Sequence, residues 1–252
     1  MTTSDDTLSM LVYGSSKAGK STLTSTVPLP AMVMDAEGSW KFIDEAGFRS
    51  GVKLRKRAWD PNQEPLPDYD GTWDVLHVKV TSWLAMQQCY VALTQQEHRF
   101  ASLVLDSITE VQRRCKRNIA PASTQMQQQH WGQLLDQMDG LIRGYRDLTL
   151  LPNTIRCVVF VSEMAMKDGK WRPYMQGQIR DTLPYWVDVC GYLYTEFVTD
   201  PTTGAVTEKQ KRLLIGPHPQ YEAGERVGGR LPDTVEDPNI SRMLEQIYPP
   251  NR

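Results

Sequence analysis

Residues 8–26, LSMLVYGSSKAGKSTLTST, join a short apolar run to a glycine-rich loop and then to a helix-forming stretch. The apolar run 8–13 predicts a buried strand, and residues 21–26 predict a helix. Between them, Gly14 to Ser21 matches the pattern G-x-x-x-x-G-K-[ST] at every position. Because a strand precedes the loop and a helix follows it, this match predicts a phosphate-binding loop.

The loop is expected to hold the phosphates of ATP. Its backbone N–H groups and the N-terminus of the next helix present positive charge to the β-phosphate. Lys20 would neutralise oxygens of the β- and γ-phosphates, the hydroxyl of Ser21 would bind Mg²⁺, and Thr22 would reach the α-phosphate. The expected ATP-binding residues are Gly14, Ser15, Ser16, Lys17, Ala18, Gly19, Lys20, Ser21 and Thr22.

A second magnesium ligand is expected at Asp106. The apolar run 103–105 ends in this carboxylate, which places it at the carboxyl edge of a buried strand, where open α/β sheets bind ligands. The same carboxylate could instead cap a helix that begins at Ser107 or Ile108. With a phosphate loop in the chain the metal role is favoured, so the predicted metal site consists of Ser21 and Asp106.

The rest of the chain alternates strand and helix patterns. Strands are expected over 31–34, 75–80, 102–105 and 155–161, and helices over 82–97, 108–119 and 131–148. A loop or hairpin over 163–174, a helix over 179–188, a hairpin of strands 189–198 and 212–215, and a last helix over 239–247 follow. This order predicts a single α/β domain over residues 1–252, with a mostly parallel central sheet, flanking helices and a C-terminal antiparallel extension. The proline-rich, charged segment 50–73 predicts a surface excursion.

Composition narrows the classes of function. With 28 Lys and Arg against 30 Asp and Glu, the net charge is −2, so any nucleic-acid site must be a local patch. The sequence contains no transmembrane run and no signal-peptide pattern, which predicts a cytoplasmic protein without a membrane partner. The four cysteines form no C-x-x-C pair, so reduced thiols are expected rather than a zinc site, with Cys157 and Cys190 in the core.

Two carboxylates, Asp35 and Glu37, follow the second expected strand in the segment Met34-Asp35-Ala36-Glu37-Gly38. With the phosphate loop and Leu105-Asp106-Ser107, this segment resembles the RecA-like recombinase ATPases, in which the glutamate of an Asp-x-Glu signature activates water. The resemblance implies that Glu37 and Lys20 are catalytic, whereas the alternative is a surface carboxylate at a turn.

The resemblance extends, in the order of elements, to the compact (Sak-type) RecA-like proteins of bacterial viruses that anneal single strands. It is supported by Lys17 and the segments Asp106-Ser107-Ile108-Thr109-Glu110, Ile179-Arg180-Asp181 and Trp186-Val187-Asp188-Val189. This likeness implies an ATPase that uses ATP and Mg²⁺, binds single-stranded DNA, forms a homo-oligomer and works with a single-strand-binding protein in annealing or recombination. One departure is the family's glutamine sensor, whose place is taken by Ser162 or Glu163.

Basic segments with aromatic residues are candidate surfaces for single-stranded DNA. The position of residues 163–180 resembles the DNA-binding loop of RecA-like proteins. The candidates are Arg113, Arg114, Lys116, Arg117, Lys167, Lys170, Trp171, Arg172 and Arg180, with a third basic segment at residues 53–57. They could equally be solvated faces, and Lys167, Lys170 or Arg180 could instead reach the γ-phosphate of a neighbouring subunit.

Two other functions fit a phosphate loop. A switch ATPase that acts on a protein partner agrees with the near-neutral charge of the chain. A small-molecule kinase agrees less well, because an Asp-x-Glu motif is not typical of kinases. Tyr13 and Trp40 are expected to be packing residues rather than platforms for bases.

Overall fold

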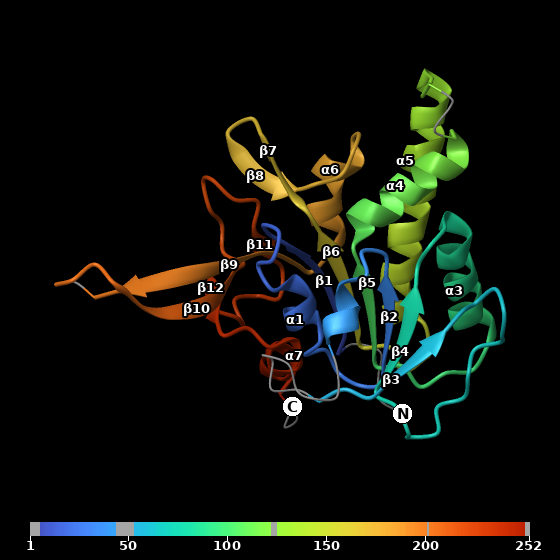
Figure 1. Cartoon of the computed structure of the whole chain (residues 1–252), viewed down its shortest axis with the longest axis horizontal. Coiled ribbons are helices and arrows are strands. Elements are labelled where there is room, and N and C mark those ends of the chain that lie inside the picture. Colours follow the sequence, from blue (N-terminus) through green and yellow to red (C-terminus); the bar gives the residue numbers. More distant parts are fainter. Residues whose placement is uncertain (1–5, 44–52, 122–124, 201, 250–252) are drawn as a thin grey trace.

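A ten-stranded, mostly parallel sheet forms the centre of the computed structural model, which describes residues 6–43, 53–121, 125–200 and 202–249 (Figure 1). Its strands are β1 (Leu8–Tyr13), β2 (Ala31–Asp35), β3 (Lys56–Trp59), β4 (Val75–Lys79), β5 (Ser102–Asp106), β6 (Cys157–Ser162), β9 (Val189–Thr199), β10 (Val206–Leu214), β11 (Gly224–Glu225) and β12 (Thr234–Glu236). The order is β12-β10-β9-β1-β6-β5-β2-β4-β3, and β11 pairs with β9. Neighbours from β9 to β3 are parallel, whereas β10, β11 and β12 pair antiparallel. The predicted fold class is confirmed.

Helices cover both faces of the sheet. They are α1 (Lys20–Thr24), α3 (Trp83–Gln95), α4 (Ile108–Ile119), α5 (Gln128–Asp147), α6 (Ile179–Thr182) and α7 (Ile240–Ile247), with 3₁₀ helices η1 (Ser39–Phe42), η2 (Leu148–Leu150) and η3 (Leu183–Trp186). Successive strand residues face opposite sides. Thus Met10 of β1 packs with Leu23 of α1 and Ile240 of α7, whereas Leu11 belongs to the core beneath α3, α4 and α5. Both faces of the central strands are therefore buried, as their unbroken apolar runs predict.

The carboxyl ends of the parallel strands bring the sequence motifs to one edge. In the register of the sheet, Asp35 at the end of β2 is opposite Asp106 at the end of β5. Tyr13, the last residue of β1 before the phosphate loop, is opposite Ser162 at the end of β6. The hydroxyl of Ser107 accepts a hydrogen bond from the backbone N–H of Glu110 and so caps α4 beside this edge.

The prediction that residues 50–73 form a surface excursion is wrong for part of this segment. Residues 50–52 lie outside the described part of the chain, but β3 forms an edge strand of the sheet and pairs with β4. Leu54, Trp59 and Trp73 are buried in the two cores. These apolar residues are scattered among prolines and charges, so composition alone indicated a solvated loop.

Three elements near the C-terminus refine the prediction. The turn at Asp168-Gly169 joins β7 (Met164–Lys167) to β8 (Lys170–Pro173) in a two-stranded sheet of its own, as expected for the hairpin. The helix expected over 179–188 is split into α6 and η3, because Pro184 cannot continue an α-helix. The return strand begins at Val206 rather than near Arg212. The sequence did not predict this earlier start, because residues 206–209 are exposed and show no apolar alternation.

Several packing predictions are confirmed. Tyr13, Trp40, Cys157 and Cys190 are buried. Within the described residues, no helix has both the length and the apolar character needed to cross a membrane.

Candidate nucleotide-binding site

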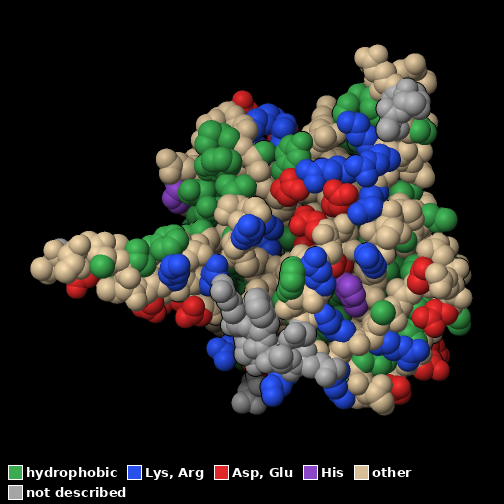
Figure 2. All heavy atoms as spheres, in the orientation of Figure 1, with side chains coloured by type: hydrophobic (Ala, Val, Ile, Leu, Met, Phe, Trp, Pro, Cys, Tyr) green, Lys and Arg blue, Asp and Glu red, His purple; other side chains and the backbone are tan. Residues whose placement is uncertain are grey.

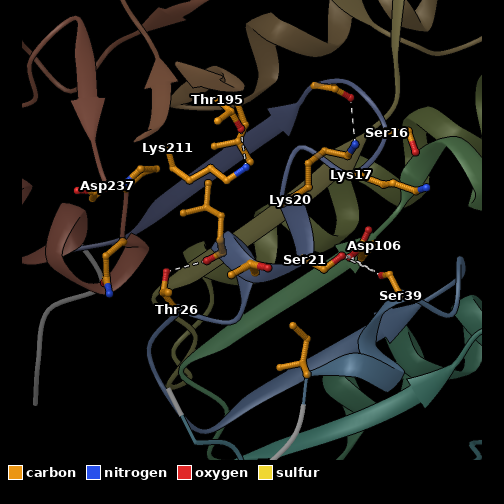
Figure 3. A pocket seen from close by; sticks show the side chains of 18 of the residues that line it. Ser16, Lys17, Lys20, Ser21, Thr26, Ser39, Asp106, Thr195, Lys211 and Asp237 are labelled. Carbon is orange, nitrogen blue, oxygen red and sulfur yellow. Dashed lines mark hydrogen bonds between the residues drawn. The ribbon is translucent and has the colours of Figure 1, made fainter. Parts of the chain in front are cut away.

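The phosphate loop between β1 and α1 opens into a cavity of about 1370 Å³, large enough for a nucleoside triphosphate (Figure 3). Gly19, immediately before α1, has a φ of 100°, a conformation that favours glycine. Gly14 passes so close to the carbonyl oxygen of Leu193 in β9 that a Cβ atom there would clash. The loop residues that line the cavity are Gly14, Ser16, Lys17, Gly19, Lys20, Ser21 and Thr22, while Ser15 and Ala18 complete the turn.

Lys20 folds back over the loop. Its Nζ donates to the carbonyl oxygens of Gly14 and Ser15, each at 3.0 Å. Burial lowers the pKa of this lysine, while the nearby carboxylates Glu37 and Asp106 act in the opposite direction. A phosphate at the mouth of the loop would offer Lys20 a charged acceptor in place of two neutral carbonyls, and such bonds are stronger.

Asp106 is the point on which three side chains from other elements converge. Its Oδ2 accepts from Ser21 Oγ at 2.7 Å, from Ser39 Oγ at 3.1 Å and from Trp40 Nε1 at 3.2 Å. Figure 3 shows Ser21 and Ser39 pointing toward this carboxylate from α1 and η1. Burial, together with the charges of Glu37 and Asp35, raises the pKa of Asp106 to about 6.

This arrangement fits Mg²⁺. A hydroxyl oxygen and a carboxylate oxygen 2.7 Å apart form a hard-oxygen donor pair of the type that Mg²⁺ shares with substrate phosphates and water. Ser21 and Asp106 would hold the ion between them.

Glu37 and Asp35 play different parts although one residue separates them. Asp35 is buried and accepts from the backbone N–H groups of Gly38 and Ser39 at 2.7 and 3.2 Å, so it builds the turn. Burial by itself would raise the pKa of Asp35, but hydrogen bonds from His77 and from this turn outweigh it and lower the pKa. Glu37 is exposed, lines the cavity and accepts a hydrogen bond from Ser107 Oγ. The turn therefore aims Glu37 at the nucleotide space.

Ser162 and Glu163, the two residues that could take the place of the glutamine sensor, lie in different surroundings. Ser162 is fully buried, and its hydroxyl lies 3.1 Å from Thr109 Oγ1, away from the cavity. Glu163 lines the cavity and accepts a two-pronged ion pair from Arg113, at 2.7 and 2.8 Å. Of the two, only Glu163 lines the cavity.

A further lysine at the loop, from a distant strand, was not predicted from the sequence. Lys211 of β10 donates from Nζ to the carbonyl oxygen of Ala18 at 2.7 Å and to Thr195 Oγ1 at 2.6 Å. Figure 3 shows Lys211 and Thr195 on the side of the cavity opposite Asp106. No sequence pattern indicated this contact, because Lys211 lies 193 residues from Ala18 in a strand without apolar alternation.

A family model described as an AAA domain matches residues 6–227 of this chain. The chain belongs to this family. No curated protein matches the sequence. The phosphate loop and the Ser21–Asp106 pair agree with this membership, so the AAA domain is a P-loop ATPase domain.

Two solved structures resemble the AAA domain. The ATPase of the type III secretion system of pathogenic bacteria has a TM-score of 0.45 and 13% identity, over 74% of this chain and 52% of that chain. The flagellar accessory protein FlaH from Methanocaldococcus jannaschii has a TM-score of 0.43 and 10% identity, over 91% and 84% of the two chains. This chain thus spans about half the length of the secretion ATPase.

The basic residues of α4 in the AAA domain do not form one free patch, although Figure 2 shows basic side chains crowded over this helix. Arg114 donates to the carbonyl oxygens of Ala36 at 2.9 Å and Thr81 at 2.8 Å, so it braces the turn that carries Glu37. Lys116 lies over the ring of Trp131, 5.0 Å from its centroid. Arg117 is exposed. Because both terminal nitrogens of Arg114 donate to backbone carbonyls within the fold, Arg114 is a weaker candidate for a DNA contact than Arg117, and its DNA role stays a prediction.

The segment 163–180 brings its cations together around two carboxylates. Lys167, Arg172 and Arg180 lie 3.0 to 3.4 Å from oxygens of Asp181. Lys170 and Arg172 also pair with Glu222. Trp171 is half-buried, and its backbone hydrogen-bonds to Gln220 and Glu222.

The third basic segment, 53–57, is tied to the fold. Arg55 forms an ion pair with Asp74 at 2.7 Å, and Lys56 Nζ donates to the carbonyl oxygen of Trp40 at 2.8 Å. These contacts position β3 and η1, while Lys53 is exposed, so the role of this segment in binding DNA stays a prediction.

Proposed function

We propose that this AAA domain is a Mg²⁺-dependent ATPase that binds single-stranded DNA and promotes annealing or homologous recombination. We also propose that a bacterial virus encodes it and that it acts in the host cytoplasm as a homo-oligomer, with a single-strand-binding protein as a partner. The observation that carries the ATPase part is the convergence of Ser21 and Asp106 beside the phosphate loop.

The residues of the site divide the work of ATP hydrolysis among them. The loop amides and Lys20 would bind the β- and γ-phosphates, and Ser21 and Asp106 would hold Mg²⁺. Bound Mg²⁺ would spread the negative charge that develops during phosphoryl transfer. Glu37 is held at one oxygen by Ser107, which leaves its other oxygen free to orient the attacking water and take its proton.

Helix α4 supports the coupling of this site to DNA. The helix begins beside Asp106, and Thr109 of its first turn donates to the carbonyl oxygen of Tyr174 at 2.9 Å. One turn further, Gln112 donates to the carbonyl oxygen of Gln176 at 3.0 Å and accepts from its backbone N–H at 2.7 Å. These hydrogen bonds join α4, which begins at the nucleotide edge, to residues 174 and 176 of segment 163–180.

The charges of that segment support a nucleic-acid partner. Four cations, Lys167, Lys170, Arg172 and Arg180, share the two carboxylates Asp181 and Glu222. Asp168 adds a third negative charge in the turn, which leaves a small excess of positive charge. Partly exposed ion pairs contribute little stability, so DNA phosphates can replace the carboxylates at small cost.

A protein partner is the second candidate, and the hairpin of β9 and β10 favours it. This hairpin projects from the body of the molecule in Figure 1, and Figure 2 shows hydrophobic side chains along it. Phe197, Val198 and Val206 are 57, 38 and 52% exposed. Exposed apolar side chains on a projecting element are typical of protein contacts.

Two assays separate the candidates. ATP turnover is measured with and without a single-stranded oligonucleotide, and binding of the labelled oligonucleotide is followed across a salt series. The proposal predicts binding that weakens with salt and is reduced in Lys167→Ala/Lys170→Ala, but not in the matched surface variant Lys79→Ala/Arg99→Ala. If the wild type binds no oligonucleotide at low salt, the protein-switch candidate replaces the DNA proposal.

A further inference from the structure

A row of aromatic rings lies on the face of β9 that the nucleotide does not occupy. The rings of Tyr192 and Tyr194 have centroids 5.5 Å apart and planes 10° apart, and Tyr221 stacks on Tyr192 at 4.1 Å and 13°. His218 adds a tilted ring 5.1 Å from Tyr221. Three tyrosine rings from two segments are therefore nearly parallel.

Alternation along β9 separates this row from the ATP cavity. Leu193 and Thr195 line the cavity beside the phosphate loop. Tyr192 and Tyr194, the alternate residues, face the other side of the sheet, where Tyr192 packs against the core beneath α3 to α6. The same strand thus presents the nucleotide cavity on one face and the aromatic row on the other.

Cations flank both ends of the row. Arg212 is directly opposite Tyr194 in the β9–β10 pair, so both side chains share one face. At the other end, Trp171 bridges to Tyr221, and Lys170 and Arg172 pair with the adjacent Glu222. The Tyr221 end of the row therefore lies beside segment 163–180.

We propose that this aromatic row, Tyr192, Tyr194, Tyr221 and His218, is a stacking platform for the bases of single-stranded DNA. The inference rests on the proposed function and names where the bases lie. Tyr194 ends the row, because Tyr192 is its one ring neighbour among the described residues. A base stacks on Tyr194, while Arg212 and Lys170 contact phosphates on either side, which is the combination of aromatic faces and positive charge that single strands need.

Acidic neighbours of the row do not prevent this binding. Arg212 pairs with Glu196 and Glu236, whose side chains are 50 and 74% exposed. The Arg212 side chain itself is 13% exposed, so the open partners are the two carboxylates, and a phosphate that approaches from solvent can take the place of either one. Removing one acidic partner, as in Glu236→Gln, is therefore expected to strengthen DNA binding.

The test compares oligothymidylate binding by the wild type, Tyr194→Ala and Tyr194→Phe at one fixed salt concentration. Loss of one stacked base is expected to weaken binding roughly 10-fold in Tyr194→Ala, whereas Tyr194→Phe keeps a flat ring and stays close to the wild type. The matched control is Tyr185→Ala, which removes a tyrosine that is 79% exposed outside the row. ATP affinity is expected to be unchanged in each variant, because the row lies on the other face of the sheet.

A second measurement uses the wild type and so does not depend on a variant that folds. An oligothymidylate carrying 5-iodouracil is cross-linked by light, and the modified peptide is mapped by mass spectrometry. Cross-links at Tyr194 or Tyr221 support the platform. Cross-links outside the row, or equal binding by Tyr194→Ala and the wild type, overturn it but leave the proposed function standing. Absence of any oligonucleotide binding by the wild type overturns both.

Discussion

Ser21 and Asp106 lie 85 residues apart in the sequence, yet the hydroxyl of the first donates to the carboxylate of the second at 2.7 Å. The contact exists because β1 and β5 are parallel strands whose carboxyl ends reach the same edge, with β6 alone between them. One oxygen comes from the helix after the phosphate loop and the other from the end of a buried strand.

Lys20→Ala is expected to lose ATP binding while the chain remains folded. The lysine makes its two hydrogen bonds within the loop, so its removal costs little stability but takes away the cation that faces the phosphates. ATP with Mg²⁺ is expected to raise the melting temperature of the wild type and to leave that of Lys20→Ala unchanged. Thermal unfolding with and without nucleotide measures both, and an equal shift in the two proteins contradicts the assignment.

Asp106→Asn is expected to stabilise the nucleotide-free protein while abolishing Mg²⁺-dependent turnover. The pKa of Asp106 is raised from 3.8 to about 6, so the folded chain binds this proton more tightly than the unfolded chain. Above about pH 6 the folded protein carries the full cost of the buried charge, on the order of 3 kcal/mol, and this cost disappears as the pH falls toward 4.

Urea unfolding of the wild type and Asp106→Asn at pH 7.5 and pH 5 measures this difference. The gain in stability of the variant is expected to be larger at the higher pH. A variant that is less stable than the wild type at pH 7.5 contradicts the assigned electrostatics of the site.

Glu37→Gln is expected to lower ATP turnover by about 100-fold and to leave ATP affinity unchanged. The substitution keeps an acceptor for the Ser107 hydroxyl but removes the base that takes a proton from water. Single-turnover hydrolysis and nucleotide titration separate the two effects. If Glu37→Gln hydrolyses ATP at the wild-type rate, Glu37 is not the residue that activates the attacking water.

The motifs and the sheet could be predicted from sequence because each rests on neighbours in the chain. The phosphate loop, Asp106 and Glu37 each follow an apolar strand, and parallel strands bring such ends together without further information. Lys211 could not be predicted, since its contact with Ala18 depends on a hairpin 193 residues away. The partners of the basic segments were equally hidden, because Glu222 lies on a distant loop and Arg114 reaches back across two strands.

Arg114→Ala is expected to destabilise the protein by about 2 kcal/mol, because the carbonyl oxygens of Ala36 and Thr81 lose charged donors. The control Arg117→Ala, on an exposed position of the same helix, is expected to change stability by less than about 0.5 kcal/mol. Urea unfolding measures both variants. Equal stability of the two variants would show that the hydrogen bonds of Arg114 do not stabilise the fold.

The most direct measurement is a crystal structure with a non-hydrolysable ATP analogue and Mn²⁺, with the ion located by anomalous scattering. The triphosphate is expected on the amides of the loop at residues 14–21, with Mn²⁺ between Ser21 and Asp106 and Glu37 facing the γ-phosphate. An empty loop, or an ion bound away from both Ser21 and Asp106, would contradict the account.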